Sequence, residues 1–160
     1  MPISNHRKTL TMLEKIQHFF THHISLLDPK ENTEEKLKVA SAALFMEMMH
    51  TEAACENDKQ QLILTLLEKS FSLTDAQASA LIEIGEHKRK QATDYFEFTH
   101  LISTEFTREQ KIQLIESLWE IAFMDNHLDL DEEYLIDKVA RLLFIPRNEV
   151  LDARNRIRKS

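Results

Sequence analysis

Apolar residues recur every three or four positions along most of this chain, and polar or charged residues fill the positions between them. This spacing predicts amphipathic α-helices, because strands would show a strict alternation instead. The helical pattern covers about eight segments, which lie at residues 8–27, 33–49, 59–71, 75–90, 95–102, 108–124, 130–144 and 147–158. Apolar coverage is widest in residues 37–49, so we expect this segment to form the centre of the fold.

Helix start signals stand at several of these boundaries. In a capping box, Ser, Thr, Asp or Asn is followed three residues later by Glu or Gln, and the two residues satisfy each other's backbone N–H groups. The chain contains this pattern at Asn32 and Glu35, Thr74 and Gln77, Asp94 and Glu97, Thr107 and Gln110, and Asp129 and Glu132. Pro146 separates the last two predicted helices, since proline fits a first helical turn but not a helix interior.

Composition narrows the fold class to all-α. One Gly and three Pro among 160 residues leave few turn residues, which disfavours hairpin-rich β folds. A chain of this length buries enough surface for one core, so we expect residues 8–160 to form a single helical domain. We expect residues 1–7, which are mostly polar, to be a disordered N-terminus.

Composition also bounds the location and the partners. The single cysteine, Cys55, excludes an intramolecular disulfide, and no N-terminal stretch resembles a signal peptide, so we expect a cytoplasmic protein. No apolar run approaches the roughly 18 residues that span a bilayer, so we expect at most peripheral membrane contact. The net charge of -7 disfavours nucleic acid as a partner, because phosphate binding needs a basic surface.

Acidic residues crowd the turn between the two predicted helices at 108–124 and 130–144. They are Asp125, Asp129, Asp131, Glu132 and Glu133. Several carboxylates at one turn suit a hard cation such as Ca²⁺ or Mg²⁺, which prefers oxygen ligands. The spacing is not that of an EF-hand loop, because Leu130 stands where that loop needs Gly. In a purely structural interpretation, the same acids accept backbone N–H groups at the turn and at the helix start.

The chain also shows an internal repeat with an offset of 73 residues, which is the separation of Glu52 and Asp125. With this offset, Glu52, Glu56 and Asp58 fall on Asp125, Asp129 and Asp131. The predicted helices at 33–49 and 59–71 fall on those at 108–124 and 130–144. We therefore predict an internally duplicated helical hairpin within a compact bundle of about seven to eight helices.

The segment Ala122–Glu133 reads Ala-Phe-Met-Asp-Asn-His-Leu-Asp-Leu-Asp-Glu-Glu. It resembles the signature Ala-x-x-Asp-Gly-x-Ile-x-x-x-Glu-Glu of the tellurite-resistance protein B (TerB-like) family. The resemblance covers about residues 37–158, and it implies a compact helical bundle in which the signature occurs twice. The chain differs from the family pattern at four positions: Ala53 and Asn126, where the family has Gly, and Lys59 and Gln60, where acids are expected.

The resemblance further implies that the acidic residues bind a metal cation. It assigns ligand roles to Asp125, Asp129, Asp131 and Glu133 at the second turn and, less closely, to Glu52, Glu56 and Asp58 at the first. A divalent cation, Ca²⁺ or Mg²⁺, is the expected cofactor.

No motif indicates an enzyme. The chain has no glycine-rich phosphate loop, and Cys55 has no base beside it in sequence. Two Glu-x-x-His pairs, Glu47 with His50 and Glu97 with His100, occur about as often as random placement predicts.

We therefore expect a non-enzymatic scaffold or cation-responsive module, which the resemblance links to tellurite or metal stress. The alternative is a protein-interaction domain without a metal, akin to the TerB-like segment of co-chaperones. Both hypotheses include an unidentified protein partner.

Overall fold

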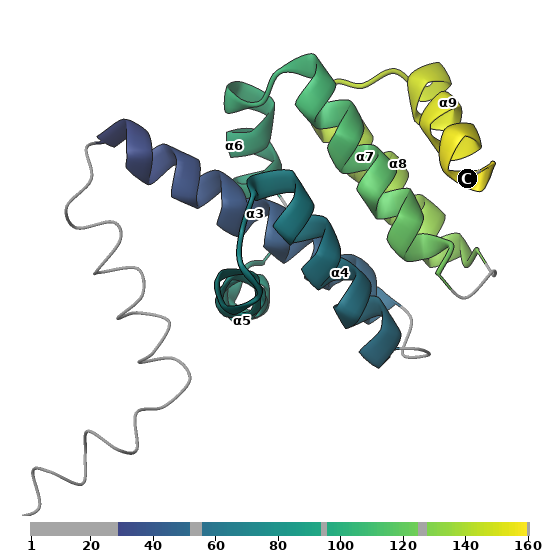
Figure 1. Cartoon of the computed structure of the whole chain (residues 1–160). Helices are drawn as coiled ribbons and strands as arrows, with labels where there is room; N and C mark the ends of the chain where they lie inside the picture. Colours follow the sequence, from purple (N-terminus) through teal and green to yellow (C-terminus); the bar gives the residue numbers. More distant parts are fainter. Residues whose placement is uncertain (1–28, 52–55, 94–95, 125–127, 160) are drawn as a thin grey trace, which may run out of the picture.

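A computed structural model describes residues 29–51, 56–93, 96–124 and 128–159, which form seven helices and no strand. The helices are α3 (Pro29–Thr51), α4 (Glu56–Phe71), α5 (Asp75–Gln91), α6 (Phe96–Glu105), α7 (Arg108–Ala122), α8 (Leu130–Leu142) and α9 (Arg147–Arg158). The all-α prediction is confirmed over this part of the chain (Figure 1). The segment 1–7 and the predicted helix at 8–27 lie outside the described residues.

Helix α3 forms the centre of the bundle, as its wide apolar coverage predicted. Every residue from Val39 to Met49 is buried except Glu47, which is partly exposed. Helices α4, α5, α6 and α7 all pack against α3 (Figure 1). The predicted start at Asn32 is wrong, because the helix begins three residues earlier, at Pro29. Proline suits the first helical position, where its fixed φ is helical and its missing N–H has no intrahelical partner to lose.

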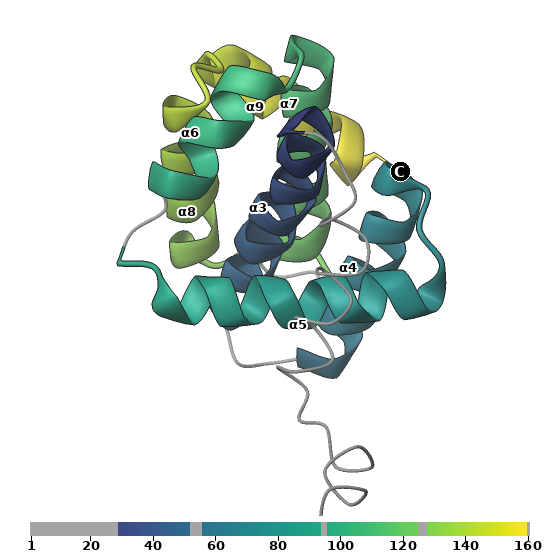
Figure 2. The ribbon, with the colours of Figure 1, turned by 90° about the vertical axis from the view of Figure 1, so that its left-hand side faces the viewer.

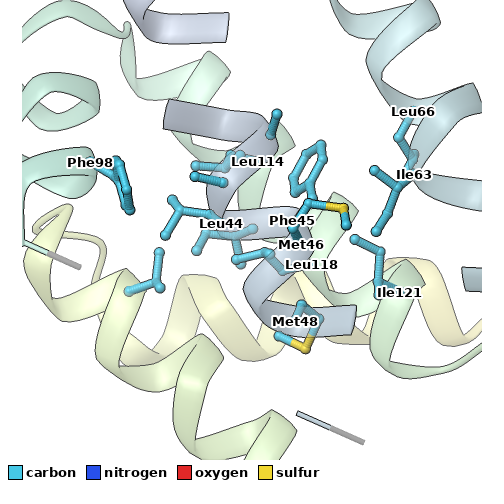
Figure 3. Close-up of a cluster of buried hydrophobic side chains, with 14 of the residues drawn as sticks. Leu44, Phe45, Met46, Met48, Ile63, Leu66, Phe98, Leu114, Leu118 and Ile121 are labelled. Atoms are coloured by element: carbon cyan, nitrogen blue, oxygen red, sulfur yellow. The ribbon is translucent and has the colours of Figure 1, made fainter. Parts of the chain in front are cut away.

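The core is one continuous apolar cluster to which every described helix contributes. Figure 3 shows Leu44 and Phe45 of α3 beside Leu114 and Leu118 of α7 in the middle of this cluster. Side chains of α4 and α6 close the cluster on opposite sides. Ile121 and Leu135, which the repeat places on the inner faces of α7 and α8, are both buried. The aliphatic faces of the two helical hairpins, α3–α4 and α7–α8, therefore meet inside the bundle.

The capping boxes fix the starts of two helices where the sequence predicted them. The hydroxyl of Thr74 accepts the N–H of Gln77 at 3.2 Å, and the Gln77 side chain accepts the N–H of Thr74 at 2.9 Å. Thr107 and Gln110 form the same pair of bonds at the start of α7. Asp94, the predicted cap of the following short helix, lies outside the described residues.

Helix α5 crosses α3 at very short range (Figure 2). The crossing lies at Gly85, the single glycine of the chain. A Cβ at Gly85 would lie 2.8 Å from the Cβ of Ala42 and 2.9 Å from the carbonyl carbon of Ala42. The missing side chain is what allows the two helix backbones to approach this closely.

Helix α9 covers α7 on the other side of the bundle. It starts after Pro146, as predicted, and buries Val150 and Ala153. The indole nitrogen of Trp119, a buried residue of α7, donates a hydrogen bond to the carbonyl oxygen of Val150 at 3.1 Å. In the first hairpin, α3 thus packs against α5 through a close approach of the two backbones. In the second hairpin, α7 contacts α9 through the large side chain of Trp119.

Candidate functional site

A buried carboxylate organises the start of α8. Asp129 is the N-cap of this helix, as the sequence predicted. The Oε1 atom of Glu132 accepts the backbone N–H of Asp129 at 3.3 Å. Its Oε2 atom lies 3.4 Å from the ammonium nitrogen of Lys59, in the first turn of α4. Glu132 therefore caps α8 and joins this helix to α4.

Both members of this ion pair are fully buried, with side chains that are 0% exposed. Burying an isolated charge destabilises the folded state by roughly several kcal/mol. The ammonium group of Lys59 and the carboxylate of Glu132 can therefore be buried only because each compensates the charge of the other. Lys59 follows the first acidic turn and Glu132 follows the second. We call this arrangement the hairpin joint, because it connects α3–α4 to α7–α8.

The two residues of the hairpin joint are 73 positions apart, which is the offset of the predicted repeat. In the predicted repeat the two residues occupy the same position, one as a cation and the other as an anion. The internal duplication itself stays a prediction.

The structure describes four of the predicted metal ligands with their side chains. Asp58 and Asp131 are exposed, and Asp129 and Glu133 are partly buried. Within the described ranges, no three His, Cys, Asp or Glu side chains gather closely enough to hold a metal ion. Glu52, Asp125 and the side chain of Glu56 lie outside the described residues. The complete ligand set therefore stays a prediction.

The described residues are poorly suited to bind a metal cation at the acidic turn before α4. Lys59 stands where the family signature has an acid, and its ammonium group is buried beside Glu132. A buried positive charge at this place repels a metal ion. The hairpin joint thus contains a cation of its own.

In the sequence, Lys59 stands out only as a departure from the family pattern. Its position gives a further signal, because Lys59 lies one turn before Ile63 on the buried face of α4. A lysine on an apolar helix face often extends its ammonium group to water. Here the offset of 73 to Glu132 was the feature that could have identified its partner.

A second charged cluster joins the C-terminal halves of α3 and α5. Arg89 donates to Glu86 at 2.5 Å through Nε and to Glu47 at 3.2 Å through Nη1. The Nε2 atom of His50 lies 2.5 Å from Glu86. Burial raises the pKa of Glu86, but the hydrogen bonds with His50 and Arg89 outweigh burial, so this pKa is lowered. Glu47 thus forms an ion pair between helices, and His50 forms a hydrogen bond between helices.

Three of the five large apolar side chains that are exposed among the described residues belong to α8 or lie just after it: Leu130, Tyr134 and Phe144. The other two are Met124, which follows α7, and Phe96 of α6. Leu130 and Tyr134 lie one turn apart on the same side of α8, and they are 80% and 63% exposed. Figure 2 shows α8 at the edge of the bundle. We call Leu130, Tyr134 and Phe144 the α8 outer surface.

Phe144 has an unusual backbone conformation as well as an exposed ring. Its φ is 60°, and it follows α8 at the position where glycine is usual. The N–H of Ile145 returns to the carbonyl of Ala140 at 2.9 Å, which completes a Schellman motif. The left-handed conformation costs a residue with a side chain about 1 kcal/mol. The ring is 79% exposed, so packing within the fold offsets little of this cost.

Together these features define a compact all-α module in which two helical hairpins meet at a buried ion pair. Residues 38–155 match the family model described as Tellurite resistance protein TerB. The match covers most of the chain, so the chain belongs to the TerB family, and the resemblance found in the sequence is confirmed. The search of curated proteins and the search of solved structures each returned no match. Among the described helices, none combines the length and the apolar character needed to cross a membrane.

Proposed function

We propose that this TerB module is a non-enzymatic cytoplasmic scaffold that binds a protein partner through the α8 outer surface. The observation that supports this proposal is the combination, at Phe144, of a costly backbone conformation with an exposed aromatic ring. Aromatic side chains are enriched at the centres of protein interfaces, where burial of the ring in a partner would offset the cost. Leu130 and Tyr134 supply further apolar contact area on the same helix.

The substitution Phe144→Gly separates partner binding from folding. Glycine relieves the left-handed conformation, so the variant should fold at least as well as the wild type while it loses the ring. Ser72→Gly is the matched control, because Ser72 follows α4 with a φ of 54° and carries no large side chain. Both variants and the wild type would be used as bait for affinity capture from the native host, with quantitative mass spectrometry.

We expect a partner that the wild type and Ser72→Gly capture equally and that Phe144→Gly loses by at least about tenfold, as for a hot-spot aromatic. Combined Leu130→Ser and Tyr134→Ser substitutions should weaken capture of the same protein. Equal capture by all variants would exclude the α8 outer surface as the binding site. A wild type that captures only further copies of itself would replace the scaffold proposal with self-association.

A cation-responsive role is the second candidate, and the acidic first turn of α8 favours it. This turn contains Asp131, Glu132 and Glu133, directly after the N-cap Asp129. Calorimetric titration of Ca²⁺ and Mg²⁺ into chelator-treated protein tests this role, with Asp129→Asn plus Asp131→Asn as the comparison. Saturable binding that the double variant loses would support a response to metal or tellurite stress. No heat and no change of Tm at millimolar cation would rule it out.

A further inference from the structure

A cavity of about 460 Å³ opens between α3, α5, α6 and α8. The charged side chains of its lining are Glu47, Arg89, Lys90 and Lys138, and the rest of the lining is Ala43, Ala92, Thr93 and Phe98. Figure 2 shows the C-terminal end of α5 reaching the side of the bundle formed by α6 and α8. The volume lies in the range of small-molecule sites, roughly 300–1,000 Å³, and is larger than a simple inorganic ion needs.

The charges around the cavity favour an anion. Among the described residues, three cationic side chains, Arg89, Lys90 and Lys138, line it together with one carboxylate, Glu47. Glu86, which binds Arg89 next to the cavity, adds a second carboxylate, so the cations exceed the carboxylates by one. The C-terminal end of α5 adds only about half a negative charge, which this surplus exceeds. This local balance opposes that of the whole chain, whose net charge is -7.

Arg89 is held in place before any ligand arrives. Glu86 binds its Nε atom and Glu47 binds its Nη1 atom, and these carboxylates come from two different helices. Glu86 is itself held by His50. The Nη2 amino group is not used in these bonds and can donate to a ligand. An arginine fixed in this way loses little side-chain entropy on binding.

The apolar part of the lining indicates an organic ligand. Phe98 is 6% exposed, and the partly exposed Ala92 contributes a methyl group. An apolar group placed against these side chains would be removed from water, which favours binding in proportion to the buried area. We propose that the cavity binds a small organic anion, whose phosphate or carboxylate group contacts Arg89 and Lys90 and whose apolar part packs on Phe98.

Phenyl phosphate is a suitable probe, because it joins a doubly charged head to a flat apolar ring at about pH 7.5. Its titration into the full chain would be followed by amide NMR shifts at constant ionic strength. We expect saturable shifts that are largest at Ala92, Thr93 and Phe98. Phenol, which lacks the charge, and inorganic phosphate, which lacks the ring, should each bind at least about fivefold more weakly.

Two lysines in the last turn of α5, Lys88 and Lys90, provide a matched pair of variants that test the cavity. Lys90→Ala removes an exposed lysine that lines the cavity, whereas Lys88→Ala removes an exposed lysine two residues earlier that does not line it. Both variants should fold normally. We expect Lys90→Ala to weaken phenyl phosphate binding about fivefold and Lys88→Ala by less than about twofold. Equal losses would mean general attraction to a basic helix end, and non-saturable shifts would mean no site; either result overturns the proposal.

Discussion

The two hairpins of this module share a layout but differ at the hairpin joint and at their C-terminal ends. At the hairpin joint, α4 contributes the cation Lys59 and α8 contributes the anion Glu132. After its second helix, the first hairpin has the small residue Ser72, whereas the second has the exposed ring of Phe144. Charge at the joint is balanced between the hairpins, whereas the large exposed apolar side chains among their described residues all belong to the second hairpin.

The largest expected effect tests the balance of charge. Lys59→Met keeps an apolar stem of similar length but leaves the carboxylate of Glu132 buried without its cation. We expect the free energy of unfolding to fall by about 3–5 kcal/mol, which is typical of a broken buried pair. Urea denaturation followed by circular dichroism measures this loss. Lys69→Met, at an exposed position of the same helix, should change stability by less than about 0.5 kcal/mol. A similar small change for Lys59→Met would contradict the balance.

A second substitution tests whether α5 packs on α3 of the first hairpin through the missing side chain of Gly85. Gly85→Ala places a methyl group 2.8 Å from the Cβ of Ala42 and 3.0 Å from the backbone nitrogen of Ala43, where neither neighbour can rotate away. We expect a loss of about 1–3 kcal/mol from overpacking, despite the better helix propensity of alanine.

Thermal unfolding measures the effect of Gly85→Ala. The control is Ser79→Ala, on the exposed face of the same helix, which should be neutral or slightly stabilising. Stabilisation by Gly85→Ala would show that α5 does not approach α3 through the glycine.

The ends of the two hairpins give a prediction of the opposite sign. Phe144→Gly should raise the free energy of unfolding by about 0.5–1 kcal/mol, because relief of the left-handed conformation exceeds the entropy that glycine adds to the unfolded chain. Ser72→Gly should give a similar gain. Guanidinium denaturation measures both values. Destabilisation by Phe144→Gly alone would mean that the ring packs within the fold and is not kept for a partner.

The smallest effect concerns Glu120, the counterpart of Glu47 in the repeat. Glu47 pairs with Arg89, whereas burial raises the pKa of Glu120, nearby Glu116 raises it further, and Lys69 offsets part of this rise. A raised pKa means that the folded state disfavours the charged carboxylate. Its destabilising contribution is therefore present above the folded pKa and disappears as the pH falls through that value.

Glu120→Gln should accordingly stabilise the fold at neutral pH by a few tenths of a kcal/mol, roughly, since solvent screens this partly exposed group. The gain should vanish below the ordinary pKa of 4.5. Glu47→Gln should instead lower stability at neutral pH, because it removes the charge that faces Arg89. Unfolding curves across the pH range measure both. Equal effects of the two substitutions would contradict the difference between the hairpins.

Local signals in the sequence predicted most of the described fold. The capping boxes at Thr74 and Thr107 placed two helix starts correctly, because the hydrogen bonds involved span only three residues. The wide apolar coverage of residues 37–49 predicted the central helix, because a helix that is apolar on several sides must be packed on several sides. The predicted start of α3 was wrong because Pro29 and Asn32 are both residues that favour a helix start. The sequence alone does not show which of the two begins the helix.

The candidate sites were less predictable, because their contacts join distant segments. The burial of Lys59 depends on the packing of α4 against the rest of the core, and helical periodicity assigns a lysine to the surface by default. The cavity needs α3, α5, α6 and α8 to meet, which no local motif encodes. The conformation of Phe144 was also missed, since glycine is the residue that normally marks such a position.

A double-mutant cycle on the hairpin joint tests most directly whether the two hairpins depend on their own buried ion pair. It combines Lys59→Met with Glu132→Gln, whose amide oxygen can still accept the N–H of Asp129. Urea unfolding of the wild type, both single variants and the double variant gives the coupling energy. We predict a coupling of about 2 kcal/mol or more, so that the double variant is more stable than Lys59→Met alone. Additive losses, with a coupling below about 0.5 kcal/mol, would contradict the pairing of Lys59 with Glu132.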